Sequence, residues 1–353
     1  MRRFTWLVNL TLALTLMVIA LGAYTRLTDA GLGCPDWPGC YGRLTPPVKD
    51  VHIEAAQARF PDAQIDPFKA RNEMMHRYIA GLLGLCVLAV FILAQRLRRA
   101  RGLSAALLAL VMFQAALGMW TVTMNLMPVV VVAHLFGGFA LLSMLVLLRV
   151  ELGRDPADPV EPRLTRLLPL AWLGLAVLLA QIALGGWTSA NYAAAVCYQL
   201  PFCEGGWHAQ FSLRAAFSLP LGHETYEYGV LPYEARMSIH VLHRMGALVV
   251  TAVLAGLVLL CMRRAMSARL RGLAASVGVL LVLQVTLGLI NVVGQVPLFN
   301  AVAHNVTAAC LLAALVLLVR QLHVQSGQVL HARGRARPGA AYGVAVQGPM
   351  KLR

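Results

Sequence analysis

The sequence predicts an all-α membrane protein in which eight transmembrane helices form two tandem four-helix bundles. Three observations predict this fold class: the composition is apolar, eight apolar runs have membrane-spanning length, and the chain repeats itself. Of the 353 residues, 59% are hydrophobic and 13% are charged, whereas charged residues make up roughly 25% of an ordinary soluble domain. The mean hydropathy of +0.69 agrees with a chain whose solvent is largely the lipid bilayer.

The eight apolar runs are each long enough to cross a bilayer, because about 20 helical residues span roughly 30 Å of hydrocarbon. They lie at 5–23, 74–94, 103–124, 128–148, 167–187, 238–260, 272–293 and 298–319. Arg2 and Arg3 resemble the start of a signal sequence, but no small-residue cleavage site follows the first run. We therefore interpret this run as an uncleaved span, and the even number of spans places both termini on one side.

The basic residues predict which side that is. Both termini and the segments 95–102, 149–166 and 262–271 together carry 20 of the 30 Lys and Arg residues but only 4 of the 15 Asp and Glu residues. The positive-inside rule makes these segments cytoplasmic and the cysteine loops periplasmic. The absence of an Arg- and Ser-rich presequence favours a bacterial plasma (inner) membrane over a mitochondrial one. The net charge of +15 then reflects topology and contact with membrane lipid, and requires no nucleic acid.

The chain repeats one pattern at an offset of 163 to 170 residues. The repeated residues are Cys34 and Cys40 as Cys197 and Cys203, His76-Arg77 as His243-Arg244, Gln114 as Gln284, and Ala133-His134 as Ala303-His304. Each copy contains an even number of spans, so both have the same orientation. We therefore expect the two bundles to be related by a pseudo-two-fold axis along the membrane normal.

The repeat divides the chain into four parts. The N-terminal half covers 1–148 and the C-terminal half 167–319. A cytoplasmic linker at 149–166 contains three prolines, which stop helices. The basic tail at 320–353 is expected to be disordered.

The four repeated histidines predict cofactor sites. His76, His134, His243 and His304 lie roughly 5–10 Å below the outer surface at 1.5 Å per helical residue. A single histidine of this kind can be a satisfied helix-packing residue, but ionisable residues within spans are costly and usually functional. Two imidazoles from facing helices suit axial ligation of haem iron in a bundle core. Zinc normally requires more ligands, and no carboxylate or thiol is duplicated beside the pairs.

Two further residue types accompany these histidines. Arg77 and Arg244 directly follow ligand candidates, so their guanidinium groups either reach haem propionates or extend to the lipid headgroups. Gln114, Gln181 and Gln284 are each separated by two residues from a Leu-Gly pair. We interpret the glutamines as helix-packing polar groups rather than site residues.

The copies differ three residues before the first histidine, where Glu73 in the first half corresponds to His240 in the second. Positions i and i+3 share a helix face, so Glu73 would lie near the centre that His76 faces and act as a base or proton relay. The alternative is a first-turn acid favoured by the helix dipole, with Asn72 as N-cap. The asymmetry predicts that the first half does the chemistry and the second holds a redox partner.

The cysteine pairs Cys34-Cys40 and Cys197-Cys203 have equal spacing and lie in predicted outer loops, where disulfides persist. We expect two loop disulfides, and a redox-active role stays open for the first pair. A four-cysteine metal site is disfavoured because the spacing is not that of a close metal-binding pair. Cys86, Cys261 and Cys310 lie in predicted spans and are interpreted as packing residues.

Five motifs resemble the haem A synthase family. They are GAYTRLTDAGLGCPDWPGCYG at 22–42, EMMHR at 73–77, AH at 133–134, HR at 243–244 and AH at 303–304. The resemblance extends through the eighth predicted span, and its most specific part is the first-loop motif. It implies an oxidoreductase that oxidises the C8 methyl of haem O to a formyl group, by two successive hydroxylations and dehydration, giving haem A for terminal cytochrome oxidases. Some family members lack the cysteine pairs, so the resemblance does not make the chemistry depend on them.

The resemblance also implies residue roles. His243 and His304 would hold a haem b cofactor, His76 and His134 the substrate haem, and Glu73 would be the acidic residue needed for catalysis. Haem O synthase would be the donor of haem O, and an electron acceptor is required that the sequence does not identify.

Two other functions were weighed against this one. A dihaem b-type electron-transfer protein needs haems at two depths, one near each surface, whereas all four histidines are predicted near the outer surface. A transporter built on a duplicated bundle would bind no haem. The predicted depth of the histidines therefore favours the enzyme.

Overall fold

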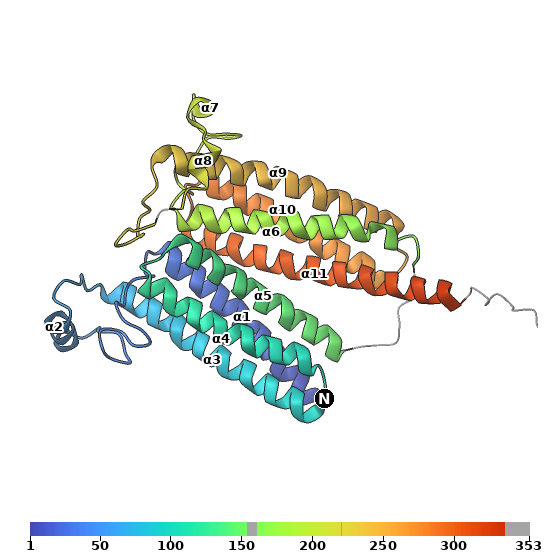
Figure 1. Ribbon diagram of the computed structural model, residues 1–353, viewed down its shortest axis with the longest axis horizontal. Helices are drawn as coiled ribbons and strands as arrows, with labels where there is room; N and C mark the ends of the chain where they lie inside the picture. Colours follow the sequence, from blue (N-terminus) through green and yellow to red (C-terminus); the bar gives the residue numbers. More distant parts are fainter. Residues whose placement is uncertain (154–160, 220, 336–353) are drawn as a thin grey trace, which may run out of the picture.

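A computed structural model describes residues 1–153, 161–219 and 221–335 (Figure 1). Within these residues, eight helices are long and apolar enough to cross a membrane, and each coincides with one predicted run. They are α1 (Arg2–Leu27), α3 (Pro67–Leu97), α4 (Arg101–Thr123), α5 (Pro128–Leu152), α6 (Leu168–Ala190), α9 (Tyr233–Arg264), α10 (Ala268–Val293) and α11 (Leu298–Arg335). The prediction of an all-α protein with eight spans is confirmed.

Shorter helices lie in the connections. α2 (Asp50–Arg59) lies in the long loop before α3, and α7 (Trp207–Gln210) and α8 (Leu213–Ala216) lie in the long loop before α9. A single 3₁₀ turn, η1 (Thr165–Leu167), leads into α6. Figure 1 shows α2, α7 and α8 at one end of the molecule, opposite the N-terminus.

Local sequence signals fix where the helices begin. The Asp66 side chain accepts hydrogen bonds from the main-chain N–H groups of Phe68 and Lys69, and Pro67 occupies the first turn of α3. α3 therefore begins seven residues before the predicted run. Asn72 is buried inside this helix, so the alternative that made Asn72 an N-cap and Glu73 a first-turn acid is wrong.

The predicted disordered tail is also partly wrong. α11 continues through Arg335, so residues 320–335 are helical. Leu322 is fully buried in the core of the second half, and the Gln325 side chain accepts a hydrogen bond from the main-chain N–H of Glu161 at 3.4 Å. These contacts provide partners for the polar end of the helix. The composition of the sequence does not reveal them. Residues 336–353 of the tail lie outside the described residues.

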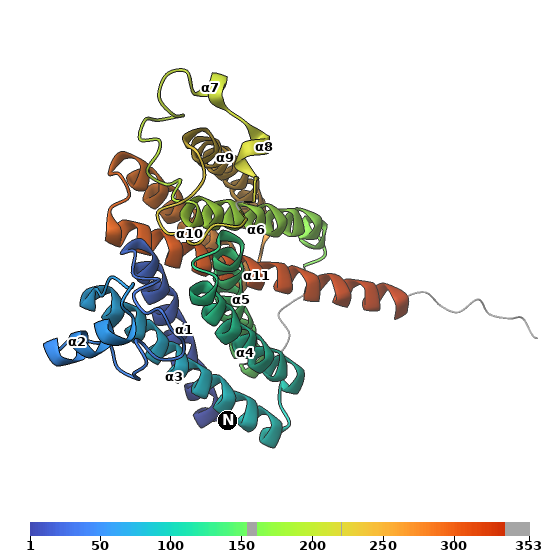
Figure 2. The same ribbon diagram turned by 60° about the vertical axis from the view of Figure 1, so that its left-hand side comes forward.

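The long helices form two bundles (Figures 1 and 2). In the first, α1 packs against α3 and α5, and α4 packs against the same two helices. In the second, α6 packs against α9 and α11, and α10 packs against those two. One cluster of buried side chains, with Phe4 and Leu145, lies in the first bundle, and a larger one, with Leu254 and Leu315, lies in the second and extends to Phe139 of α5.

The two bundles meet through α1, α5, α6 and α11. α1 packs against α11, α5 packs against α6, and α5 also packs against α11. Because α1 corresponds to α6 in the repeat and α5 to α11, the first two contacts are equivalent and the third pairs equivalent helices. The pseudo-two-fold axis stays a prediction, and these reciprocal contacts are the ones that it requires.

The linker between the halves is fastened by one carboxylate. Glu161 is buried and accepts hydrogen bonds from the main-chain N–H groups of Met266 (2.6 Å) and Ser267 (2.9 Å). Ser267 is also the N-cap of α10, because its hydroxyl accepts from Leu270 N–H. A negative charge at a helix N-terminus is favourable. Glu161 therefore joins the linker to the turn between α9 and α10.

We predict that Glu161→Ala lowers the free energy of unfolding by about 1–2 kcal/mol, because two charge-assisted hydrogen bonds are lost. Burial opposes the ionised form, but the two main-chain donors prevail and hold the pKa of Glu161 below its usual range. The stabilisation is thus present at neutral pH and is lost as the pH falls through this lowered pKa. Thermal unfolding in detergent at pH 7, and at a pH below the lowered pKa of Glu161, measures both effects. Glu151→Ala, which changes an exposed carboxylate on α5, should leave stability unchanged, and equal effects of the two substitutions would contradict the prediction.

Candidate functional site

The structure brings the four predicted histidines into two pairs, one in each bundle. His76 on α3 and His134 on α5 are close enough to interact electrostatically, as are His243 on α9 and His304 on α11. Within the described residues, α3 makes no close main-chain contact with α5, nor α9 with α11. The helices of each pair therefore lie diagonally across their bundle, which is the arrangement from which facing side chains bind a cofactor.

Each histidine ring packs against a glycine of a neighbouring helix. A methyl group on Gly22 would lie 3.0 Å from Cε1 of His76, and one on Gly185 would lie 3.1 Å from Cε1 of His243. The corresponding distances are 3.5 Å from Gly118 to His134 and 3.2 Å from Gly288 to His304. These glycines occupy positions that the repeat relates. A methyl group would therefore crowd the imidazole at Gly22, Gly185 and Gly288, whereas at Gly118 it would make an ordinary contact.

Haem fits these residues. The Nδ1 atoms of His76, His134 and His304 are buried and have no hydrogen-bond partner. Buried polar atoms are normally paired, and unpaired ring nitrogens in facing histidines are suited to metal ligation. Imidazole pairs without a carboxylate or thiol beside them suit haem iron better than zinc. The assignment of the two pairs to particular haems stays a prediction.

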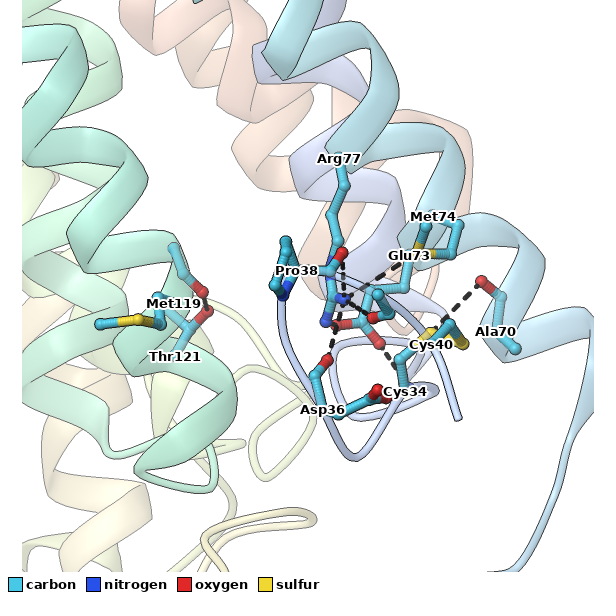
Figure 3. A network of polar contacts seen from close by, with 12 residues as sticks. Cys34, Asp36, Pro38, Cys40, Ala70, Glu73, Met74, Arg77, Met119 and Thr121 are labelled. Atoms are coloured by element: carbon cyan, nitrogen blue, oxygen red, sulfur yellow. Dashed lines mark hydrogen bonds and ion pairs between the residues drawn. A yellow bond between two sulfur atoms is a disulfide. The ribbon is translucent and has the colours of Figure 1, made fainter. Parts of the chain in front are cut away.

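The Glu73 carboxylate fastens the first cysteine loop to α3 (Figure 3). This side chain is buried, accepts a hydrogen bond from Cys34 N–H at 2.8 Å and pairs with the Arg77 guanidinium at 2.5 Å. Arg77 in turn donates to the carbonyl oxygens of Asp36 (3.0 Å) and Gly39. Glu73 thus lies one helical turn outward of His76, between the ligand candidate and the loop.

The second half has the same arginine contact, but its helix carries no carboxylate at the position that corresponds to Glu73. Arg244 donates to the carbonyl oxygens of Cys197 (2.7 Å) and Gln199 (2.6 Å). His240 stands in the place of Glu73, is buried, and its Nδ1 has no hydrogen-bond partner. Both arginines therefore hold their own cysteine loops, and their predicted contacts with haem propionates stay predictions.

Both cysteine loops are closed by the predicted disulfides. Cys34 is bonded to Cys40 and Cys197 to Cys203. Cys86, Cys261 and Cys310 are free and lie in α3, α9 and α11, as predicted. A close approach also fixes the first loop, since a methyl group on Gly33 would lie 2.5 Å from the main chain of Lys69.

Two glutamines belong to the histidine sites, contrary to the interpretation from sequence. Gln181 Nε2 lies 3.1 Å from Nδ1 of His243 and donates to the carbonyl oxygen of the same residue at 2.8 Å. Gln284 Nε2 lies 3.1 Å from Nε2 of His304. The signal for this role was present in the sequence, because each glutamine is four residues before a glycine that faces the same histidine.

The outer loop of the second half reaches across to the first half. Lys69 at the start of α3 pairs with Glu227 at 3.3 Å, and Asn125 donates to the carbonyl oxygen of Glu224 at 2.7 Å. Arg26 donates to the Ser189 carbonyl oxygen at 2.5 Å and lies 4.0 Å from the centre of the Tyr192 ring. The two histidine pairs are therefore held in one connected outer end.

Comparisons with known proteins find one family model and relatives that share one name. The COX15-CtaA family model, described as a cytochrome oxidase assembly protein, matches residues 5–316. A heme A synthase of Shewanella oneidensis is 50% identical over 316 residues, which cover 89% of this chain and 95% of that protein. A heme A synthase of Methylobacterium sp. is 31% identical, covering 85% and 86%. One of Paracoccus denitrificans is 29% identical, covering 87% and 84%.

We predict that Gly185→Ala weakens haem retention in the second half by about tenfold, as changes around a metal ligand typically do. The added methyl group would meet His243 Cε1 at 3.1 Å and push the ring away. Haem per purified chain, measured by pyridine haemochrome absorbance, checks this. Gly256→Ala on α9 is the matched control because nothing lies within 4 Å of its added methyl group. Equal haem content in the two variants would show that the glycine does not seat the ligand.

Proposed function

The chain belongs to the COX15-CtaA family of cytochrome oxidase assembly proteins, and on this basis we propose that it is a haem A synthase, a multi-pass bacterial membrane enzyme that converts haem O to haem A. The observation that carries the proposal is the 50% identity to a heme A synthase along almost the whole chain. The two histidine pairs support it, because a haem substrate and a haem cofactor require two separate ligand sets.

The proposed reaction is an oxidation of the C8 methyl group of haem O. Two successive hydroxylations each replace a C–H bond with C–OH and each remove two electrons from the carbon. The resulting gem-diol loses water to leave the formyl group. The cofactor, haem b, would supply electron transfer when bound. An electron acceptor and a source of oxygen are required as co-reactants, and we propose haem O synthase as the donor of the substrate.

The residues divide between two tasks. We assign His76 and His134 to the substrate haem and His243 and His304 to haem b. The assignment is supported by Glu73, whose counterpart in the second half is His240. Among the described residues, the Glu73 carboxylate is the only one that contacts a cysteine loop from within a span. Its two oxygens are held by Arg77 and by Cys34 N–H, so the carboxylate is fixed in place to accept a proton released by C–H oxidation.

The position of the histidines counts against the alternative of a dihaem electron carrier. All four lie toward the helix ends that join the cysteine loops and the short outer turns. Electron transfer across a bilayer would need haems near both surfaces. The geometry instead supports two haems at one depth, as transfer between a substrate and a neighbouring cofactor requires.

Reconstitution tests the proposed function. The purified full-length protein is supplied with haem O, dissolved oxygen and an electron acceptor, and its pigments are extracted and identified by mass spectrometry. We expect formyl-containing haem A, and resident haem b that survives His76→Ala but is lost in His243→Ala. Haem b without haem A would indicate an electron carrier, and absence of haem would indicate neither function.

We further predict that Glu73→Ala retains haem b but reduces haem A formation by at least about 100-fold, the contribution expected from a positioned acid–base group. Glu54→Ala, which changes an exposed carboxylate on α2, should leave haem A formation unchanged. Loss of haem b in Glu73→Ala would contradict the assignment of this residue to the substrate half.

A further inference from the structure

The outer end of the second half is covered by a short helix from its own loop. α8 packs against α9, and Figure 2 shows the two side by side. The main-chain N–H of Ser212, the N-cap of α8, donates to the Ser238 hydroxyl of α9 at 2.9 Å. The Trp187 indole of α6 donates to the Ala216 carbonyl oxygen at 2.8 Å. α8 is therefore fastened to both α6 and α9 at their outer ends.

This cover buries one face of α9 next to the histidine pair. Ala235 and Ser238 are fully buried and Leu242 is partly buried, and their spacing places all three on one helix face. Ala216 of α8 packs in the same cluster as Ala235 and Leu242. Ser238 lies five residues before His243, which is about 7.5 Å along the helix axis. The second half is therefore closed on this side, one to two turns outward of its first histidine.

The matching face of α3 is uncovered. The positions of the three α9 residues are taken in α3 by Phe68, Arg71 and Met75. Phe68 is 45% exposed, Met75 is 38% exposed, and Arg71 is also exposed. We call these three residues the outer face of α3.

The first long loop does not cover this face as α8 covers α9. Within the described residues, its helix α2 packs closely against no other helix, and Ala56 of α2 is instead buried in the cluster of the first cysteine loop. The loop does meet α3 further inward, where the Tyr78 hydroxyl donates to the Leu44 carbonyl oxygen. The two halves therefore differ in what covers equivalent helix faces, although both have a long outer loop.

The outer face of α3 combines a cation with apolar surface. Among the described residues Arg71 makes no ion pair, and its guanidinium lies 5.9 Å from the centre of the Phe68 ring. Its neighbour Lys69, by contrast, is paired with Glu227. A guanidinium suits a carboxylate, and aromatic and thioether side chains suit a flat apolar ring. Haem has both features, because its porphyrin ring carries propionate carboxylates.

We propose that the outer face of α3 is the docking site at which the haem substrate enters the first half, and that α8 closes the matching face of α9 so that the second half does not exchange its haem there. Arg71 pairs with a propionate, and the porphyrin lies against Phe68 and Met75. The inference rests on the proposed function, which gives the first half a substrate and the second a resident cofactor. A phospholipid phosphate would match the charge of Arg71 but not the ring, and the experiment separates the two.

Uptake of haem O by the full-length protein that carries haem b tests the docking site. Stopped-flow absorbance in non-ionic detergent follows association and does not depend on product formation. We expect Arg71→Glu to slow association by at least about tenfold, because a carboxylate repels the propionates, and Arg71→Lys to retain most of the rate. Added salt should slow uptake by the unmodified protein but not by Arg71→Glu.

A matched control makes the same charge change in the other half. Arg214→Glu alters an exposed arginine on α8 and should leave haem O uptake unchanged. Thermal unfolding in detergent shows that each variant is folded. If Arg71 instead binds a phospholipid headgroup, Arg71→Glu lowers thermal stability in phospholipid nanodiscs and takes up haem O at the unmodified rate, which contradicts the proposal.

Release of α8 tests the closure of the second half. The double substitution of Trp187→Phe and Ser238→Ala removes both hydrogen bonds that fasten α8. We expect haem b transfer to apomyoglobin, followed by absorbance, to accelerate by about tenfold. Ser276→Ala removes a hydroxyl from an exposed position of α10 and should leave this rate unchanged.

Two results would overturn the proposal: haem O uptake by Arg71→Glu at the rate of Arg214→Glu, or haem b loss from the double variant at the rate of Ser276→Ala. Both are distinct from failure of the proposed function. A protein that makes haem A but shows neither effect would contradict only the docking site and its closure. One that shows both effects but makes no haem A would contradict only the enzyme assignment.

Discussion

The structure depends on the lack of water in the hydrocarbon region, because every polar group that enters it needs a partner within the protein. Among the polar side chains in its spans are Glu73, Arg77, Arg244 and the four facing histidines. Glu73 and Arg77 satisfy each other and the main chain of the first cysteine loop. The two terminal nitrogens of Arg244 donate to carbonyl oxygens of the second loop. Among the facing histidines, Nδ1 of three is buried without a partner, and these unpaired nitrogens are the observation that supports the proposed cofactor sites.

Packing in a membrane has a different origin from packing in water, because lipid tails are as apolar as leucine and give helices little reason to associate. Small residues instead let the helices approach closely, and the resulting van der Waals contacts hold them together. Gly174 and Gly186 sit where a methyl group would meet Leu254 or Leu135 at 2.9 Å. The same property is used at the histidine sites, where four glycines admit the imidazole rings. Close helix packing and the seating of the imidazole rings therefore depend on one residue type.

The duplication gives each half the same arrangement of helices, and a few substitutions make the two halves chemically different. The disulfide loop, the arginine that holds it, the facing histidines and their glycines occur in both halves. Glu73 in place of His240 gives only the first half a carboxylate hydrogen-bonded to its cysteine loop from within the span, and Gln181 in place of Val18 gives only the second half an amide beside the first histidine of its pair. The outer loop of the second half also contacts the first half at Lys69 and Asn125, so the two sites are not independent.

The sequence alone determined the eight spans, the cysteine pairs and the set of paired histidines, because hydrophobic length and repetition are properties of the chain itself. It misplaced the start of α3 and the end of α11, since the Asp66 cap and the packing of Leu322 and Gln325 are not visible in an apolar run. Only the tertiary structure decided that Glu73 binds the cysteine loop and that Gln181 contacts His243. Periodicity shows which residues share a helix face, but the partner of that face depends on how helices pack across the bundle.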